Sequence, residues 1–205
     1  MGTNIVCFAL RFKENWFHAG PIPRYRRPMI RLFVAIRPPA PIRSQLLDLM
    51  GGVRGARWQS DDQLHLTLRF IGEVDRHTAE DVHAALESVR HPRFALSLSG
   101  VGAFDRRGQP TALWAGVSPH DPLKALHKKV DQAIARAGLE PERRAYSPHI
   151  TLARMSRGGG PVQPLIESAG NLSSPPFEVG DFRLYESSLG PEGAVYNVVA
   201  RYPLG

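Results

Sequence analysis

The 205-residue chain is predicted to fold as an α+β domain with a largely antiparallel sheet, and three observations support this prediction. Segments typical of strands outnumber segments with helical spacing, and the two kinds follow each other in mixed order. Hydrophobic residues make up 42% of the chain and charged residues 22%, as in an average globular protein. No apolar run approaches the 18 residues that a membrane-spanning helix needs.

The single cysteine, Cys7, excludes an intramolecular disulfide and a zinc site built from cysteines. A chain without disulfides fits the cytoplasm, where we expect this protein. No partner surface is evident in the sequence, so we expect a monomer. We also expect no contact with a membrane.

The net charge of +7 is unevenly distributed. Residues 1–28 carry +4, and residues 29–205 carry the remaining +3. A basic balance favours polyanions such as nucleic acid, but the mildly basic body makes charge alone a weak argument. Gly20-Pro21-Ile22-Pro23 interrupts any regular element. We therefore expect residues 1–28 to be a flexible extension or a mis-assigned start, with a transit peptide as the alternative, and residues 29–205 to form the folded domain.

The first half of that domain alternates strands and helices. The apolar run at 32–36 ends at Pro38-Pro39, which is typical of a buried strand. Helical spacing follows and stops at Gly51-Gly52. Thr78 is expected to open a second helix, with Val82, Leu86 and Val89 on one face. The expected strands are 32–36, 63–71, 94–98 and 111–117, and the expected helices are 42–50 and 78–89.

The second half begins with a helix that Asp121 caps and Pro122 opens. Its apolar stripe is Leu123, Leu126, Val130, Ile134 and Ala137, and Gly138 ends it. Strands are expected at 149–153, 177–187 and 194–202, with a loop at 157–161.

One short pattern occurs twice, 84 residues apart: His65-Leu66-Thr67-Leu68 and His149-Ile150-Thr151-Leu152. Alternate side chains of a strand share a face. Each strand therefore presents one imidazole and one hydroxyl on one side, and its aliphatic residues on the other. Two such strands side by side would line one cleft with two histidines and two threonines.

This set of side chains suits phosphodiester chemistry without a metal. A neutral histidine removes a proton from the nucleophile, and a protonated one donates to the leaving oxygen. Threonine hydroxyls donate to the non-bridging phosphate oxygens. A pair of zinc ligands is the alternative, but zinc usually takes three or four protein ligands, and neither motif holds a carboxylate. The remaining six histidines are expected to be solvent-exposed: His18, His77, His83, His91, His120 and His127.

The full strings 64–74 and 147–154, LHLTLRFIGEV and SPHITLAR, resemble the bacterial RNA 2′,3′-cyclic phosphodiesterases. These 2′-5′ RNA ligase-like proteins belong to the two-histidine (2H) phosphoesterase superfamily. The opening 29–36 and the string Ala56-Arg57-Trp58 resemble that family too. The resemblance covers about residues 29–202.

The resemblance implies two lobes related by a pseudo-twofold axis, mostly antiparallel sheets with flanking helices around a central cleft. It implies hydrolysis of RNA 2′,3′-cyclic phosphate ends to 2′-phosphates, with no cofactor. His65 would be the proton donor and His149 the proton acceptor. Thr67 and Thr151 would bind the phosphate, and Arg154 would add positive charge beside it.

Neighbouring residues are less determined by the pattern. Strict alternation puts Arg154 on the leucine face, so it reaches the cleft only where the strand ends, twists or bulges. Phe70 and Tyr146 are candidates for base stacking, but alternation favours a buried Phe70. Arg69 shares the face of His65 and is either a phosphate contact or a solvated charge at the rim.

Three other functions remain open from the sequence. The same two histidines suit a reversible 2′-5′ RNA ligase. The scaffold also suits a non-catalytic binder of RNA ends, although both intact His-Thr pairs argue against it. The third is a phosphoesterase acting on small cyclic nucleotides.

Overall fold

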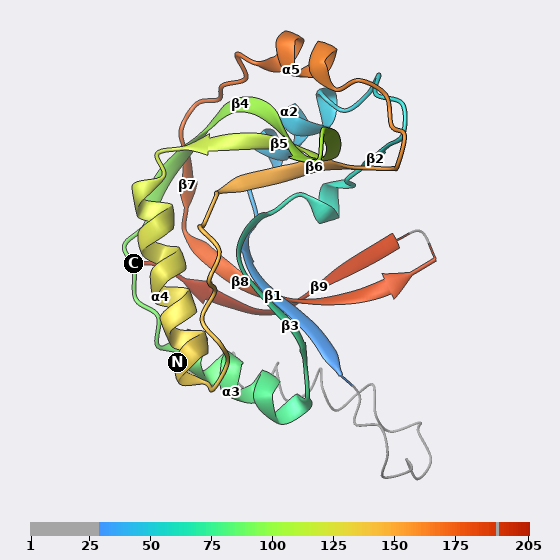
Figure 1. The fold of residues 1–205 in the computed structure, drawn as a ribbon. Coiled ribbons are helices and arrows are strands. Elements are labelled where there is room, and N and C mark those ends of the chain that lie inside the picture. The colour runs from blue at the N-terminus through green and yellow to red at the C-terminus, as the bar shows by residue number, and fades with distance from the viewer. Residues whose placement is uncertain (1–28, 192) are drawn as a thin grey trace.

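The computed structural model describes residues 29–191 and 193–205, so the predicted extension 1–28 lies outside the described residues. Within these ranges the fold is α+β, with nine strands in one curved sheet and four α-helices (Figure 1). The strands are β1 (Ile30–Ile36), β2 (Ala56–Trp58), β3 (Leu66–Val74), β4 (Phe94–Arg106), β5 (Gln109–Ser118), β6 (His149–Met155), β7 (Phe177–Val179), β8 (Asp181–Gly190) and β9 (Gly193–Pro203). The helices are α2 (Ala40–Asp48), α3 (Arg76–Glu87), α4 (Asp121–Arg136) and α5 (Gln163–Ala169), with a 3₁₀ turn, η1, at Asp61–Gln63.

The strand order places both motif strands at the centre of the sheet. The order is β7-β4-β5-β6-β3-β1-β8-β9, with β2 also paired to β6. Every pairing is antiparallel, as predicted. Counted outward from the centre, β3-β1-β8-β9 and β6-β5-β4-β7 form two four-stranded halves. They meet through one residue pair, Leu66 with Ile150.

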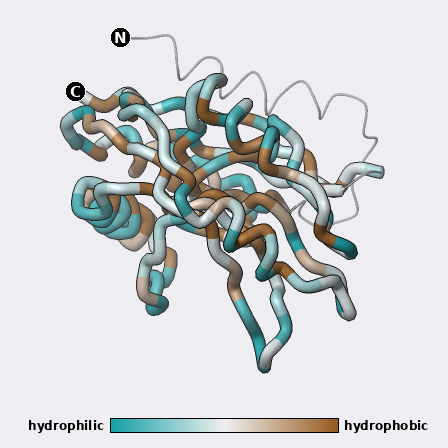
Figure 2. Tube along the Cα trace, turned by 90° about the horizontal axis from the view of Figure 1, so that it is seen from above, coloured by the Kyte–Doolittle hydropathy of each residue, from teal (hydrophilic) through white to brown (hydrophobic). Residues whose placement is uncertain are grey.

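One face of the sheet carries the main core. Figure 1 shows α3 and α4 together on one side of the molecule, where they contact each other, α4 contacts β3, and α3 contacts β1 and β9. The motif leucines are buried in this core, and Figure 2 shows hydrophobic residues gathered in the interior of the molecule. The predicted stripe of α4 is buried except for the partly exposed Ala137. A smaller cluster, Phe33, Ala35 and Tyr185, lies apart from this core.

The predicted strands are present, with boundaries that local contacts shift. β3 begins at Leu66 rather than at residue 63, because a capping box between Ser60 and Gln63 forms η1 there. The Asp75 carboxylate accepts from the Thr78 backbone N–H, so α3 begins at Arg76 and not at Thr78.

Other differences concern later elements. Val89 is buried but lies beyond the end of α3. The N-cap of α4 is His120 rather than Asp121, and no side chain caps that end. The predicted strand 177–187 is divided at Gly180 into β7, which forms one edge of the sheet beside β4, and β8, which lies between β1 and β9 near the other edge. The short β2 and α5 were not predicted, because neither has a run long enough to show periodicity.

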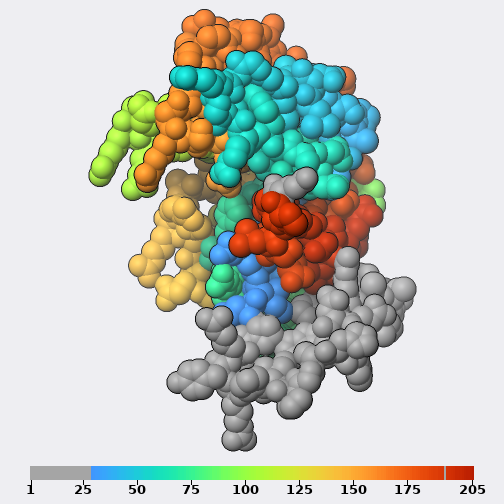
Figure 3. All heavy atoms as spheres, turned by 90° about the vertical axis from the view of Figure 1, so that its right-hand side faces the viewer, coloured from blue at the N-terminus to red at the C-terminus, as the bar shows by residue number. Residues whose placement is uncertain are grey.

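Segments far apart in the chain come together in this sheet. Figure 3 shows the C-terminal strands in red directly beside β1 in blue, which agrees with the pairing of β1 and β8. No helix within residues 29–191 and 193–205 is long and apolar enough to cross a membrane.

Candidate active site

The pair between Leu66 and Ile150 brings the two His-Thr motifs together. Both side chains are buried, so the residues flanking them point to the opposite face. Extending the antiparallel register by one residue in each direction places His65 opposite Thr151 and Thr67 opposite His149. The four polar side chains therefore share one face at the junction of the two halves, as the sequence predicted.

His65 is held by its backbone and by aromatic rings. Its Nδ1 lies 2.7 Å from the carbonyl oxygen of Gln63. A carbonyl only accepts, so Nδ1 carries the hydrogen and Nε2 is left for another partner. The ring lies 4.9 Å from that of Phe33 and meets Tyr196 edge-on at 5.3 Å, measured between centroids.

Burial is the main reason why the pKa of His65 falls from 6.5 to about 4. The Gln63 carbonyl opposes the shift, while the charges of Arg154, His149 and Arg37 add to it. The His65 imidazole is therefore neutral at pH 7 in the ligand-free protein.

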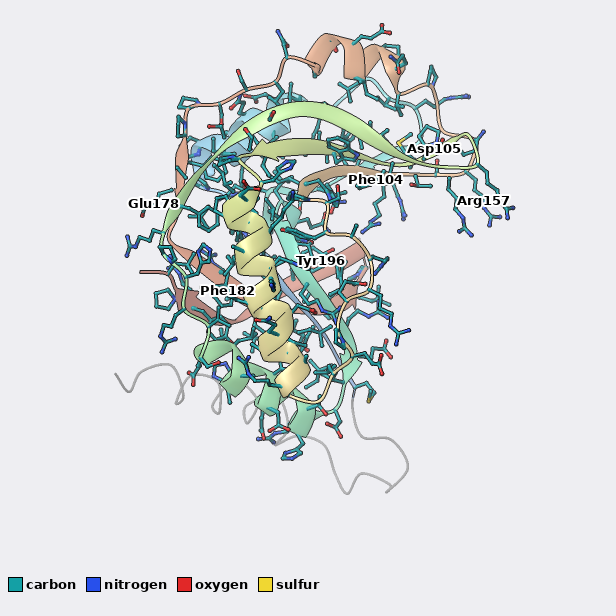
Figure 4. The ribbon with its side chains drawn as sticks, turned by 60° about the vertical axis from the view of Figure 1, so that its left-hand side comes forward. Phe104, Asp105, Arg157, Glu178, Phe182 and Tyr196 are labelled. Atoms are coloured by element: carbon teal, nitrogen blue, oxygen red, sulfur yellow. The ribbon has the colours of Figure 1, made fainter. Side chains whose placement is uncertain are left out.

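His149 has the same arrangement in the other half of the sheet. Its Nδ1 lies 2.8 Å from the carbonyl oxygen of Ser147, again two residues earlier in the chain. Phe104 meets its ring edge-on at 4.7 Å. Burial lowers the pKa of His149, the Ser147 carbonyl opposes this, and the charge of Arg154 lowers it further. Phe104 comes from β4 and Tyr196 from β9, and both are labelled in Figure 4, so each half of the sheet supplies one histidine and one aromatic neighbour.

Both motif strands carry a β-bulge at the final leucine of the motif. In β3, Thr67 pairs with Ala35 and Arg69 with Val34, which leaves Leu68 as the extra residue. In β6, Thr151 pairs with Trp114 and Ala153 with Leu113, which leaves Leu152 as the extra residue. A bulge reverses the faces of the residues that follow it.

The bulge in β6 places Arg154 on the same side as the histidines, whereas strict alternation would put it on the leucine face. Leu152 and Ala153 are both buried in succession, and Arg154 is exposed. The Arg154 charge lowers the pKa of both His65 and His149, which agrees with this position.

The bulge in β3 overturns the expectations for the next two residues. Arg69 is neither a phosphate contact nor a solvated charge, because its side chain is only 10% exposed and pairs with Asp131 of α4 at 2.8 Å. Phe70, expected to be buried, is 53% exposed, and its ring centroid lies 6.1 Å from that of Phe33. Phe70 thus occupies in β3 the position that Arg154 occupies in β6, five residues after the histidine.

Tyr146 does not stack in the cleft. It stacks on His127 at 4.1 Å, packs against the main core, and donates to the carbonyl oxygen of Thr67 at 3.2 Å. The expectation of exposed histidines is also wrong at two positions: His83 and His91 are buried, and His83 contacts the Tyr202 hydroxyl at 2.7 Å. His18 lies outside the described residues.

A cavity of about 540 Å³ adjoins His149. Trp114, Ser147 and Lys124 line it, with the residues at the start of α4. The Trp114 indole Nε1 is buried there without a hydrogen-bond partner. The sequence pattern did not reveal this cavity, because its lining comes from β4, β5, α4 and the segment before β6.

In the described part of the chain, no three His, Cys, Asp or Glu side chains come close enough to hold a metal ion.

Comparison with known proteins identifies similar sequences and structures. Residues 38–191 match the family model of the 2′-5′ RNA ligase superfamily. An RNA 2′,3′-cyclic phosphodiesterase of Aeropyrum pernix is 34% identical over 142 residues, which cover 68% of this chain and 81% of the relative. One from Archaeoglobus fulgidus is 32% identical over 170 residues, covering 82% and 96%.

The fold is similar to that of E. coli LigT in complex with 3′-AMP. The TM-score is 0.69 at 29% sequence identity, and the match covers 86% of this chain and 99% of LigT. TT0787 of Thermus thermophilus matches with a TM-score of 0.68 at 27% identity, covering 84% and 97%.

Proposed function

The chain belongs to the 2′-5′ RNA ligase superfamily, and on this basis we propose that it hydrolyses 2′,3′-cyclic phosphate ends of RNA to 2′-phosphates. The proposal includes that the reaction needs no metal or other cofactor and that the enzyme acts as a cytoplasmic monomer. The observation that carries it is the pair of His-Thr motifs, which the pairing of Leu66 with Ile150 sets on one face.

In this mechanism water attacks the phosphorus opposite the 3′ oxygen. Neutral His149 takes the proton of the water at Nε2, and His65 donates a proton from Nε2 to the departing 3′ oxygen. The new bond joins phosphorus to the water oxygen, and the bond from phosphorus to O3′ breaks. General acid–base catalysis of this kind contributes about 10²- to 10⁴-fold.

The two threonines and Arg154 bind the phosphate group in this proposal. Hydroxyl donors on opposite sides hold the non-bridging oxygens, and the guanidinium stabilises their charge. The exposed ring of Phe70 is the platform on which the terminal base stacks.

The low pKa of His65 makes its protonation depend on the substrate. A bound phosphate anion offsets the burial and the nearby cations that hold the pKa near 4. Substrate binding therefore draws a proton onto Nε2, while His149, whose pKa is also lowered, stays neutral as the base.

The proposal is tested with a short RNA that ends in a 2′,3′-cyclic phosphate, incubated in excess EDTA. We expect an RNA with a 2′-phosphate, and near-complete loss of turnover in His65→Ala and in His149→Ala. His77→Ala is the matched control, because His77 is 82% exposed on α3. Activity that EDTA abolishes and zinc restores would support a metal enzyme, and tight binding without product would support a non-catalytic binder. A cyclic mononucleotide in the same assay tests the small-substrate alternative.

The cavity beside His149 favours reversible 2′-5′ ligation as a second candidate function. Its volume of about 540 Å³ is far larger than one water needs, and it lies beside the residue that activates the nucleophile. A ribose 5′-hydroxyl there would take the place of water. Incubation of a cyclic-phosphate RNA with a 5′-hydroxyl RNA tests this, since a joined product with a 2′-5′ linkage is expected for the ligase and only hydrolysis otherwise.

A further inference from the structure

A second cavity, of about 430 Å³, lies at the end of β1. Five arginines line it: Arg37, Arg43, Arg93, Arg183 and Arg201. Its lining contains two carboxylates, Glu178 and Asp181. We call it the arginine cavity.

The arginine cavity adjoins the His65 side of the candidate active site. Ile36 of β1 pairs with Leu66 of β3, and the two strands are antiparallel. Arg37, which follows Ile36, is therefore beside His65, which precedes Leu66. The charge of Arg37 acts on the His65 ring, which agrees with this position.

The same face of the sheet connects the two sites. Phe33 pairs with Tyr185, and Ala35 pairs with Arg183, which in turn pairs with Arg201 of β9. Residues two apart along a strand share a face. Arg37 and Arg183 therefore continue the rows of β1 and β8 that carry Phe33 and Tyr185 beside His65.

Carboxylates fix several of these guanidinium groups in place. Asp181 lies between Arg183, 2.8 Å from its Nε, and Arg201, 2.5 Å from its Nη2. Arg37 donates to both Asp61 and Asp62, at 2.8 and 3.0 Å. Each guanidinium has five N–H donors, so these pairs leave donors for an anion.

The two arginines at the edge of the cavity are the more accessible ones. The side chains of Arg93 and Arg201 are 57% and 65% exposed, against 20% or less for Arg37, Arg43 and Arg183. An anion therefore meets Arg93 and Arg201 from solvent, while the other three contribute fixed positive charge behind them.

The proposed chemistry decides which anion reaches this place. His65 faces the 3′ oxygen, which stays attached to the ribose, so the ribose and the RNA preceding it lie on the His65 side. Guanidinium groups bind phosphate oxygens with matched geometry.

We propose that the arginine cavity binds the backbone phosphates that precede the cyclic end, so that the preferred substrate is an RNA oligonucleotide rather than a mononucleotide. This inference rests on the proposed function, because the reaction sets the direction of the chain.

The test compares two substrates with the same terminal nucleotide, 2′,3′-cyclic CMP and a trinucleotide ending in that group. We expect Arg201→Gln to raise KM for the trinucleotide about fivefold, the upper range for one exposed ion pair. The double variant Arg93→Gln with Arg201→Gln should raise it about 25-fold if the two free-energy effects add. In both variants kcat for the trinucleotide and KM for the mononucleotide should stay unchanged.

Arg143→Gln is the matched control, since Arg143 is exposed, paired with Glu140 at 3.0 Å, and outside the cavity lining. The salt dependence gives an independent readout. The logarithm of KM for the trinucleotide should rise more steeply with salt concentration than that for the mononucleotide, and the double variant should remove most of the difference.

If the double variant changed KM equally for both substrates, or left KM for the trinucleotide unchanged, the arginine cavity would not be an RNA subsite. The proposed phosphodiesterase activity would not be affected by that result. A wild-type protein inactive on both substrates would instead contradict the proposed function. In that case fluorescence anisotropy measures the binding of a trinucleotide that ends in a 2′-phosphate. Equal affinity of the wild type and the double variant would overturn the inference.

Discussion

Replacing His65 with asparagine should make the protein less sensitive to acid. The asparagine amide can still donate to the Gln63 carbonyl, but it cannot take up a proton. In the wild-type protein the pKa of His65 is about 4 when folded and near 6.5 when unfolded. Between these two values the unfolded chain binds a proton that the folded chain does not, so the free energy of unfolding falls as the pH is lowered.

The size of the effect follows from the two pKa values. The full difference is about 3 kcal/mol, and about 2.5 kcal/mol of it is lost between pH 7.5 and 4.5. The assay is equilibrium denaturation at a series of pH values in this range for wild type and His65→Asn. We expect the stability advantage of the wild type over the variant to shrink by about 2.5 kcal/mol on acidification.

One further variant completes this experiment. His149→Asn should change the pH dependence in the same direction, because burial lowers the pKa of that ring as well. The buried His83 is present in every protein compared, so its own titration cancels. A difference between wild type and His65→Asn that stays constant from pH 7.5 to 4.5 would refute the reasoning, because it would mean that the folded His65 accepts a proton as easily as the unfolded one.

Arg154→Gln should lower kcat/KM about tenfold, because the phosphate loses a charged hydrogen bond. The variant should also move the pH optimum of kcat/KM upward, since removing that charge raises the pKa of both imidazoles. An unchanged pH optimum would contradict this role of the Arg154 charge. Phe70→Ala should raise KM for an oligonucleotide about tenfold at unchanged kcat, and Phe70→Trp should restore it, if the exposed ring stacks on a base. Arg69→Met should destabilise the protein by about 3 kcal/mol in denaturation experiments, because it leaves the largely buried Asp131 carboxylate without its cationic partner. KM for a cyclic mononucleotide should not change in that variant, and a large rise in KM would place Arg69 at the phosphate instead.

The local pattern was enough to predict most of the strands and helices and the two His-Thr faces. Alternation along a strand is a property of one segment, and burial of Leu66 and Ile150 on one side obliges His65 and Thr151 to face the other. For the same reason the stripe of α4 followed from spacing, and the end of the helix just before Gly138, where φ is +90°, followed from the conformational freedom of glycine.

Positions that depend on two strands at once were not predictable in this way. The bulges at Leu68 and Leu152 arise from the register with β1 and β5, and they decide that Arg69 faces α4 while Phe70 and Arg154 lie on the side of the histidines. His83 is buried because Tyr202, from the far end of the chain, packs against it.

By itself, then, the sequence determined the types of the elements and the side chains that each motif strand offers, because these follow from bonds and contacts within short segments. Only the tertiary structure decided that Leu66 meets Ile150, that burial lowers the pKa of both histidines, and that Arg37, just after β1, shares one cavity with arginines of β8 and β9. These properties depend on packing between segments far apart in the chain, and no periodicity within one segment records that packing.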